Sequence, residues 1–113
     1  MTVFEKIVKA IEPFGFPFKP DTYTGCKERY FTYNFADERA ELYGDDAPIE
    51  VTAYVQIHLF MPEEENFIKI KNQVKKALFD QGFTYPAVTI DLERDVKKRH
   101  IIFECEIDEE MEE

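Results

Sequence analysis

Residues 49–60 constrain the fold more than any other part of this chain, because apolar and polar side chains alternate there without a break. One set of positions is apolar: Ile49, Val51, Ala53, Val55, Ile57 and Leu59. The other set is Glu50, Thr52, Tyr54, Gln56, His58 and Phe60. Side chains of a β-strand point alternately to its two sides, so this pattern predicts a strand with one buried face.

Three further strands are predicted from shorter alternations. Over residues 29–35, Phe31, Tyr33 and Phe35 alternate with Tyr30, Thr32 and Asn34. Similar spacing occurs over 88–92 and 101–107. The segment 36–48 is charged and too long for a tight hairpin, so we expect an extended, mobile excursion between the first two strands.

Two helices complete the predicted elements. The first begins with a capping box formed by Thr2 and Glu5, and it ends before Pro13. The second extends from Pro62 to Gly82, because the proline and the three acidic residues after it suit a helix start and the glycine suits its end. Each segment carries an apolar stripe at helical spacing.

The predicted order is helix, strand, strand, helix, strand, strand. It indicates an α+β fold: a two-layer αββαββ arrangement with an antiparallel four-stranded sheet and the helices packed on one face. With 113 residues, the chain suits a single domain at 1–107 followed by an acidic C-terminal tail at 108–113. The connector 13–26 contains three prolines and two glycines, so we expect it to be irregular but packed on the body through its aromatic side chains.

The formal net charge is −10, and most of it comes from residues 104–113, which hold seven acidic and no basic groups. The rest of the chain is close to neutral and lacks the basic footprint of a nucleic-acid-binding protein. No apolar run is long enough for a membrane helix, and the charged N-terminal residues are unlike a signal peptide, which predicts cytosolic origin. A solvated tail that aids solubility is the favoured interpretation of the acidic end, with an interaction tail as the alternative.

Residue types that perform chemistry occur without the spacing that catalysis or metal binding needs. The chain has no serine, its four glycines are scattered, and Cys105 falls at a predicted core position. Cys26 stands at a strand entrance, where a reactive thiol is the lesser alternative. His58 and His100 lack paired ligand spacing, and the acidic residues of 36–48 lack that of a calcium loop. We therefore predict no catalytic residues, no metal and no cofactor.

The surface is the distinctive feature. The less apolar face of strand 49–60 would be exposed if helices cover only its other side, unless the connector 13–26 covers it. The acidic segment 37–46 and the acidic tail complement the basic segment 94–99 and the lysines of the second helix, which suggests head-to-tail contacts between copies that close into a ring. The interface candidates are Tyr43, Asp45, Asp46, Tyr54, Phe60, Arg94, Lys97, Lys98 and Arg99.

Several phrases of the sequence are similar to those of a known family. They are Phe-Gly-Phe-Pro-Phe at 14–18, Tyr-Thr-Gly at 23–25, Tyr-Phe-Thr-Tyr-Asn at 30–34, Ala-Asp-Glu at 36–38, Leu-Tyr-Gly-Asp-Asp at 42–46 and Val-Gln-Ile-His-Leu-Phe-Met-Pro at 55–62. Together with the order of elements, and over nearly the whole chain, they resemble the tail-completion and tail-terminator (head–tail joining) proteins of long-tailed bacteriophages and prophages.

The resemblance implies a non-enzymatic virion protein that caps the tail tube or joins the tail to the head connector, typically as a hexameric ring. Its partners would be itself, the tail tube and the neck or connector proteins, with no membrane and no sequence-specific nucleic acid. It would be made in the bacterial host cytoplasm and reside in the tail or neck of the virion. The alternative is a small cytosolic protein-binding module that uses the exposed strand face; a degenerate enzyme is disfavoured because no nucleophile–base pair can be assembled.

Overall fold

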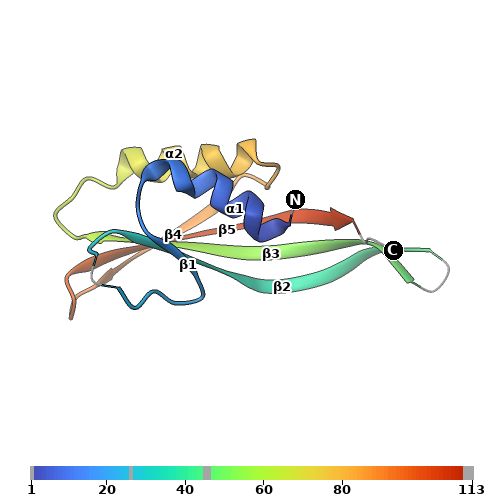
Figure 1. Ribbon diagram of the computed structural model, residues 1–113, viewed down its shortest axis with the longest axis horizontal. Coiled ribbons are helices and arrows are strands. Elements are labelled where there is room, and N and C mark those ends of the chain that lie inside the picture. Colours follow the sequence, from blue (N-terminus) through green and yellow to red (C-terminus); the bar gives the residue numbers. More distant parts are fainter. Residues whose placement is uncertain (1, 26, 45–46, 111–113) are drawn as a thin grey trace.

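The computed structural model describes residues 2–25, 27–44 and 47–110. In this part of the chain, two helices cover one side of a five-stranded sheet whose order is β1-β2-β3-β5-β4 (Figure 1). The elements in chain order are α1 (Val3–Ile11), the 3-10 helix η1 (Glu12–Phe14), β1 (Phe18–Pro20), β2 (Tyr30–Gly44), β3 (Ala47–Pro62), α2 (Ile68–Asp80), β4 (Ala87–Glu93) and β5 (Lys98–Glu110).

The edge of the sheet differs from the prediction. The α+β class is confirmed, and both helices lie on one face, but four antiparallel strands were expected and a fifth strand, β1, pairs in parallel with β2. β1 lies in the connector 13–26, which was wrongly expected to be irregular throughout. The carbonyl of Pro17 accepts from the N–H of Phe31 (2.8 Å), and the carbonyl of Tyr33 accepts from the N–H of Asp21 (2.9 Å). Prolines are tolerated here because an edge strand needs hydrogen-bond donors on one side only.

β2 and β3 form one long hairpin where a mobile excursion was expected. β2 continues to Gly44 and β3 starts at Ala47, and the two strands are paired along this length. The ladder contains several register shifts, the first between Phe35 and Asp37. Such irregularities interrupt the regular alternation of faces, so the period-two pattern cannot be followed through 36–48.

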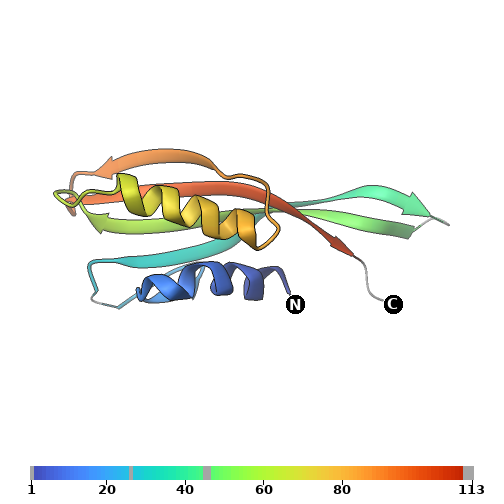
Figure 2. The ribbon, with the colours of Figure 1, turned by 90° about the horizontal axis from the view of Figure 1, so that it is seen from above.

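The far end of this hairpin extends past both helices (Figures 1 and 2). We call residues 39–52, apart from 45–46, the arm. β5 lies beside the arm as far as Glu110, which is paired with Glu50, so the first residues of the predicted tail 108–113 continue the sheet. The molecule is elongated as a result, with extents of 54 × 24 × 21 Å.

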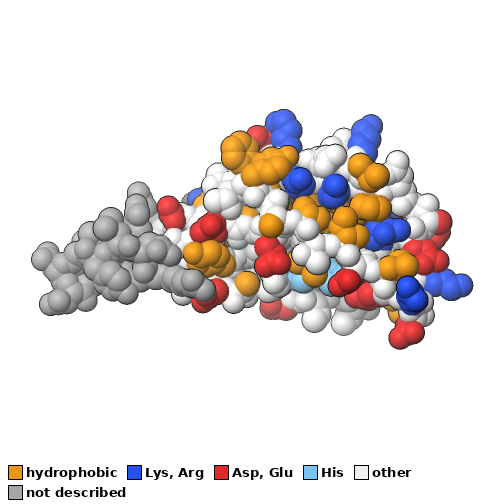
Figure 3. All heavy atoms as spheres, turned by 180° about the vertical axis from the view of Figure 1, so that it is seen from behind, with side chains coloured by type: hydrophobic (Ala, Val, Ile, Leu, Met, Phe, Trp, Pro, Cys, Tyr) orange, Lys and Arg blue, Asp and Glu red, His pale blue; other side chains and the backbone are white. Residues whose placement is uncertain are grey.

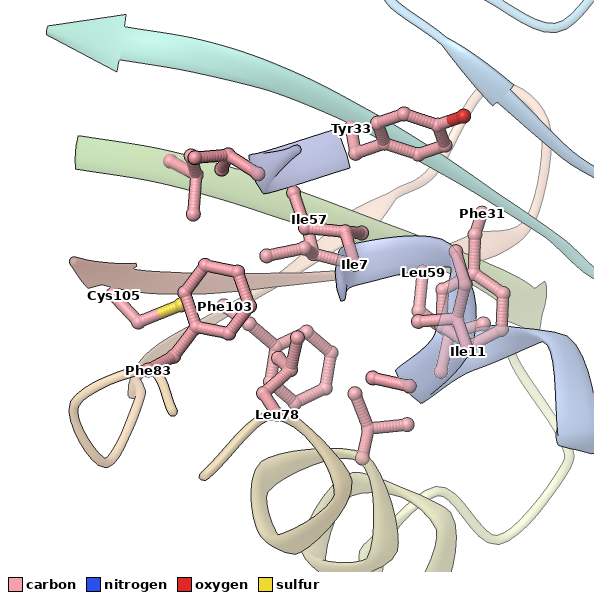
Figure 4. Packing of buried hydrophobic residues seen from close by; sticks show 14 of the residues in the cluster. Ile7, Ile11, Phe31, Tyr33, Ile57, Leu59, Leu78, Phe83, Phe103 and Cys105 are labelled. Atoms are coloured by element: carbon pink, nitrogen blue, oxygen red, sulfur yellow. The ribbon is translucent and has the colours of Figure 1, made fainter. Parts of the chain in front are cut away.

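The core lies between the sheet and the helices (Figure 4). As the alternation predicted, the apolar positions of β3 from Ala53 to Leu59 are buried. α1 lies over β2 and α2 over β3 and β5 (Figure 2). The largest fully buried side chains are Phe31, Phe83, Phe103, Ile7, Ile11, Ile57, Leu59, Leu78, Ile101, Val55 and Val74. Burial of these side chains is the main favourable contribution to folding.

The helix starts are partly as predicted. Thr2 caps α1, because its Oγ1 accepts from the N–H of Glu5 (3.2 Å). The Glu5 carboxylate accepts from the Thr2 hydroxyl (3.1 Å) and not from the Thr2 backbone, so the reciprocal half of the expected capping box is not formed. α2 begins later than expected, at Ile68, whose N–H donates to Asn66 Oδ1 (3.0 Å). The acidic residues 63–65 therefore precede the helix.

The end of α2 is as predicted. Gly82 adopts a left-handed conformation with φ of 102°. Its N–H donates to the carbonyl of Phe79 (3.0 Å), and the N–H of Phe83 donates to the carbonyl of Leu78 (3.3 Å). This bond pattern is a Schellman motif, and it directs the buried Phe83 ring back under the helix.

Candidate interaction surface

The candidate site is the face of the sheet that points away from the helices (Figure 1). We call it the outer face. By strand alternation and register, its members are Tyr30, Thr32 and Asn34 of β2; Thr52, Tyr54, Gln56, His58 and Phe60 of β3; Lys98, His100, Ile102, Glu104, Glu106 and Asp108 of β5; and Thr89, Asp91 and Glu93 of β4. No helix covers it in the part of the chain that the structure describes, in agreement with the sequence pattern.

A row of stacked rings crosses the outer face near the β4–β5 turn. Tyr23 stacks on Tyr30 with centroids 4.5 Å apart, Tyr30 stacks on Phe60 at 4.7 Å, and Phe60 stacks on His100 at 4.2 Å. The last three rings meet because Phe60 is the register partner of both Tyr30 and His100. Cross-strand aromatic pairs of this kind contribute about 0.2–1 kcal/mol each.

The connector 13–26 covers little of this face. Phe14 and Phe16 pack against Phe31, whose side chain belongs to the core between sheet and helices. Tyr23 is the connector residue that reaches the stacked row. Of the two expectations, an exposed strand face therefore agrees better with the structure than a covered one.

A second, polar row runs beside the stacked rings and connects four strands. His58 Nε2 donates to Asn34 Oδ1 (3.1 Å), His58 Nδ1 lies 2.7 Å from His100 Nε2, and His100 Nδ1 lies 3.1 Å from Glu93 Oε1. All three contacts are satisfied together when His58 is neutral with its hydrogen on Nε2 and His100 carries hydrogens on both nitrogens beside the Glu93 carboxylate. Sequence reasoning placed both histidines at the surface but did not bring them together.

The surroundings of His58 disfavour its charged form. Burial lowers the pKa of His58 most, the charge of His100 lowers it further, and Glu104 opposes both effects. The facing nitrogens of His58 and His100 share one hydrogen, and protonation of both rings would place two N–H donors against each other. The row is thus sensitive to pH in the range where histidines titrate.

Tyr54 and Phe60, two of the predicted interface residues, both lie on the outer face. Phe60 belongs to the stacked row. Tyr54 lines a hollow of about 350 Å³ beside the start of β4, together with Tyr85, Glu104 and Glu106. The hollow combines aromatic and acidic walls, a composition that suits a cationic side chain.

The basic residues 94–99 lie at the β4–β5 turn, at the opposite end of the molecule from the arm (Figure 1). Lys98 Nζ lies 4.9 Å from the centre of the Tyr30 ring. Arg99 lies 4.4 Å from the centre of the Phe67 ring and donates to the carbonyl of Glu63 (3.3 Å). Lys98 and Arg99 are thus engaged within the molecule, whereas Arg94 and Lys97 are exposed.

The other three predicted interface residues belong to the segment 43–46. Tyr43 belongs to β2 as a backbone position. Asp45 and Asp46 lie outside the described residues, as does Cys26, the candidate reactive thiol.

The described residues offer little for catalysis. Burial raises the pKa of the Cys105 thiol to about 12, which makes it inert as a nucleophile. No group of three or more His, Cys, Asp or Glu side chains in this part of the chain is placed to hold a metal ion. Among the helices that the structure describes, none has the length and apolar character needed to cross a bilayer.

Comparison with protein-family models and with curated proteins finds no match to this chain. The outer face therefore has to be interpreted from its own residues. It combines stacked aromatic rings, a hydrogen-bonded polar row and exposed carboxylates.

Proposed function

We propose that this chain is a non-enzymatic structural protein of a bacteriophage or prophage, which caps the tail tube or joins the tail to the head connector as an oligomeric, hexameric ring. The observation that carries the proposal is the arm, which extends past both helices from an otherwise two-layer body (Figure 2). The proposal also rests on the sequence phrases that resemble the tail-completion and tail-terminator family.

The arm suits a subunit that must make contacts in two directions. A ring subunit meets its neighbours through its body and the end of a tube through some extension. An unpaired loop would lose conformational entropy on binding, whereas paired strands are already ordered. The β2–β3 pairing continues to Gly44 and Ala47, so the arm is ordered before any partner is present.

The test uses tail tubes assembled without their terminator. Residues 41–50 are replaced by Asn-Gly, which closes a two-residue turn between the paired residues Ala40 and Val51. The wild-type protein should bind tube ends and stop elongation in electron micrographs. The shortened variant should stay folded by circular dichroism and fail to stop elongation. Wild-type protein that ignores tube ends, or a shortened variant that caps them equally well, would contradict the proposal.

A protein-binding module that uses the outer face is the second candidate, and the stacked row of Tyr30 and Phe60 on an uncovered sheet is the observation that favours it. Alanine substitutions at Tyr54 and Phe60 separate the two functions. They should abolish capture of a host protein if the module is correct, and that capture should take place without tail tubes.

A further inference from the structure

The two sides of this molecule carry opposite charge. α2 has four lysines and one aspartate between Ile68 and Asp80. Lys69 and Lys76 are exposed, although Lys76 Nζ also forms an exposed ion pair with Asp80 Oδ2 (2.8 Å), and Lys75 lies 5.0 Å from the centre of the Tyr85 ring. Figure 3 shows Lys and Arg side chains along the helix-bearing side at the top of the view and Asp and Glu side chains mostly below them, with further Lys and Arg side chains among the acidic ones at the right-hand end. The helix side is thus the basic side of the body.

The outer face is the acidic side. Its described carboxylates are Asp91, Glu93, Glu104, Glu106 and Asp108, while its cations are Lys19 at the β1 edge, Lys98 and, when protonated, His100. Asp91 and Glu104 are exposed. Glu93 contacts His100, and Asp108 accepts from the hydroxyl of Thr52 (2.8 Å). Carboxylates therefore dominate the β4–β5 half of this face.

Both sides also expose apolar side chains. Ile68 and Phe79 of α2 are 55% and 53% exposed, and Phe79 packs edge-on against Tyr85, which also lines the hollow beside β4. The outer face offers the stacked rings and the hollow lined by Tyr54, Glu104 and Glu106. An apolar and basic surface on one side thus matches an aromatic and acidic surface on the other, as paired interfaces require.

The β4–β5 end of the body is not uniformly basic. The basic residues of the β4–β5 turn lie against the acidic segment 63–65: the N–H of Glu63 donates to the carbonyl of Lys97 (3.1 Å), and Glu65 forms an ion pair with Arg29. Lys98 and Arg99 already contact aromatic rings. The β4–β5 end therefore carries both acidic and basic groups. The lysines of α2 form the more uniformly basic of the two surfaces.

We infer, resting on the proposed ring, that neighbouring copies of this chain meet side to side, with α2 of one copy seated on the acidic outer face of the next. The two surfaces are different, so the contact is heterologous and leaves one free surface of each kind on every pair. Repetition of such a contact closes into a ring when the rotation permits. Lysines of α2 face Asp91, Glu104 and Glu106 of the neighbour, and the hollow beside β4 receives one of them.

Charge-reversal variants test this inference. One variant carries Lys69→Glu and Lys76→Glu, and the other carries Asp91→Lys and Glu104→Lys; all four side chains are exposed, so the fold should tolerate them. Analytical ultracentrifugation at low ionic strength should show wild-type self-association, weakened by each variant at least about tenfold. A matched control, Lys9→Glu with Lys97→Glu, reverses two exposed lysines that lie outside both α2 and the strands of the outer face, and it should associate like the wild type.

The decisive measurement is a one-to-one mixture of the two reversed variants. Each variant repels itself, but the acidic α2 of the first attracts the basic outer face of the second, and the unaltered surfaces also attract each other. Association should therefore return in the mixture, with equal amounts of both variants by native mass spectrometry. Variants that assemble alone as well as the wild type, a mixture that stays monomeric, or a wild type that is monomeric both free and on tail tubes would overturn the inference.

These experiments distinguish failure of the inferred α2–outer-face contact from failure of the proposed function. If reversed variants still form rings that cap tail tubes, the proposed function stands and these two surfaces are not the interface. If the mixture restores association but neither it nor the wild type recognises tube ends, the interface stands and the proposed function fails.

Discussion

Acidification should destabilise this protein through His58. Burial and the charge of His100 hold the pKa of His58 below its ordinary value, which is about 6.5 for an unfolded chain. The unfolded chain therefore binds this proton more readily than the folded protein does. The contribution of His58 to stability is fully present above the unfolded pKa and is lost as the pH falls through the lower, folded pKa.

The magnitude follows from the contact that protonation breaks. His58 Nδ1 and His100 Nε2 lie 2.7 Å apart and share one hydrogen, so they cannot remain in contact when both rings are cationic. A hydrogen bond to a charged group contributes about 1.5–3 kcal/mol. Because the row is half-buried and partly screened by solvent, we expect a loss of about 1–2 kcal/mol. Each kcal/mol lowers Tm by about 4–6 °C in a domain of this size.

The assay is urea unfolding of the wild type and His58→Gln at a series of values from about pH 7.5 to about pH 5. The groups that face His58 are His100 and Glu104 on β5 and Asn34 on β2, with Glu93 of β4 beyond His100. Both proteins retain these carboxylates, so the difference between the two reports protonation of His58 together with its contact with His100. Wild-type protein should lose stability relative to the variant on acidification. Parallel pH profiles, or an NMR titration that places His58 at or above its ordinary pKa, would refute this reasoning.

Three stability predictions follow from the helices. Leu78→Ala should cost about 2–5 kcal/mol of unfolding free energy because Leu78 is fully buried. Phe79→Ala should cost much less because that side chain is 53% exposed. Equal losses in urea titrations would contradict the packing described. Gly82→Ala should cost about 1 kcal/mol because a φ of 102° disfavours any residue with a Cβ, and an unchanged midpoint would argue against the Schellman motif. Thr2→Ala should cost about 1 kcal/mol and Thr2→Ser close to nothing, because the hydroxyl is what caps α1; a loss with Ser as large as with Ala would exclude the cap as the cause.

The core of this fold is predictable from sequence because each of its elements is regular. The alternation over 49–60 identifies the buried face of β3 before any partner strand is known. The apolar positions Ala53, Val55, Ile57 and Leu59 are buried as it indicates. Gly82 and Phe83 likewise mark the end of α2 through a local hydrogen-bond pattern. Such signals depend on residues close in the chain, so they survive without knowledge of the tertiary structure.

The arm and β1 were missed for a different reason. Register shifts after Phe35 break the period-two pattern, and the segment 36–48 then resembles a charged loop although it is paired backbone. The prolines of β1 argue against a strand, yet an edge strand can lack donors on its outer side. In both places, non-local backbone pairing determines a structure that local side-chain pattern does not encode.

The outer face could not be assembled from sequence because it depends on register. His58 is paired with Ile102, and His100 with Phe60, so the two histidines are diagonal neighbours, and a shift of β5 by one residue would place His100 on the opposite face of the sheet. The distribution of charge over the surface likewise depends on the fold. A net charge of −10 suggests a surface that is acidic throughout, yet the fold places the α2 lysines on one side and the carboxylates of β4 and β5 on the other. An average charge cannot reveal that separation, on which the proposed contact between copies depends.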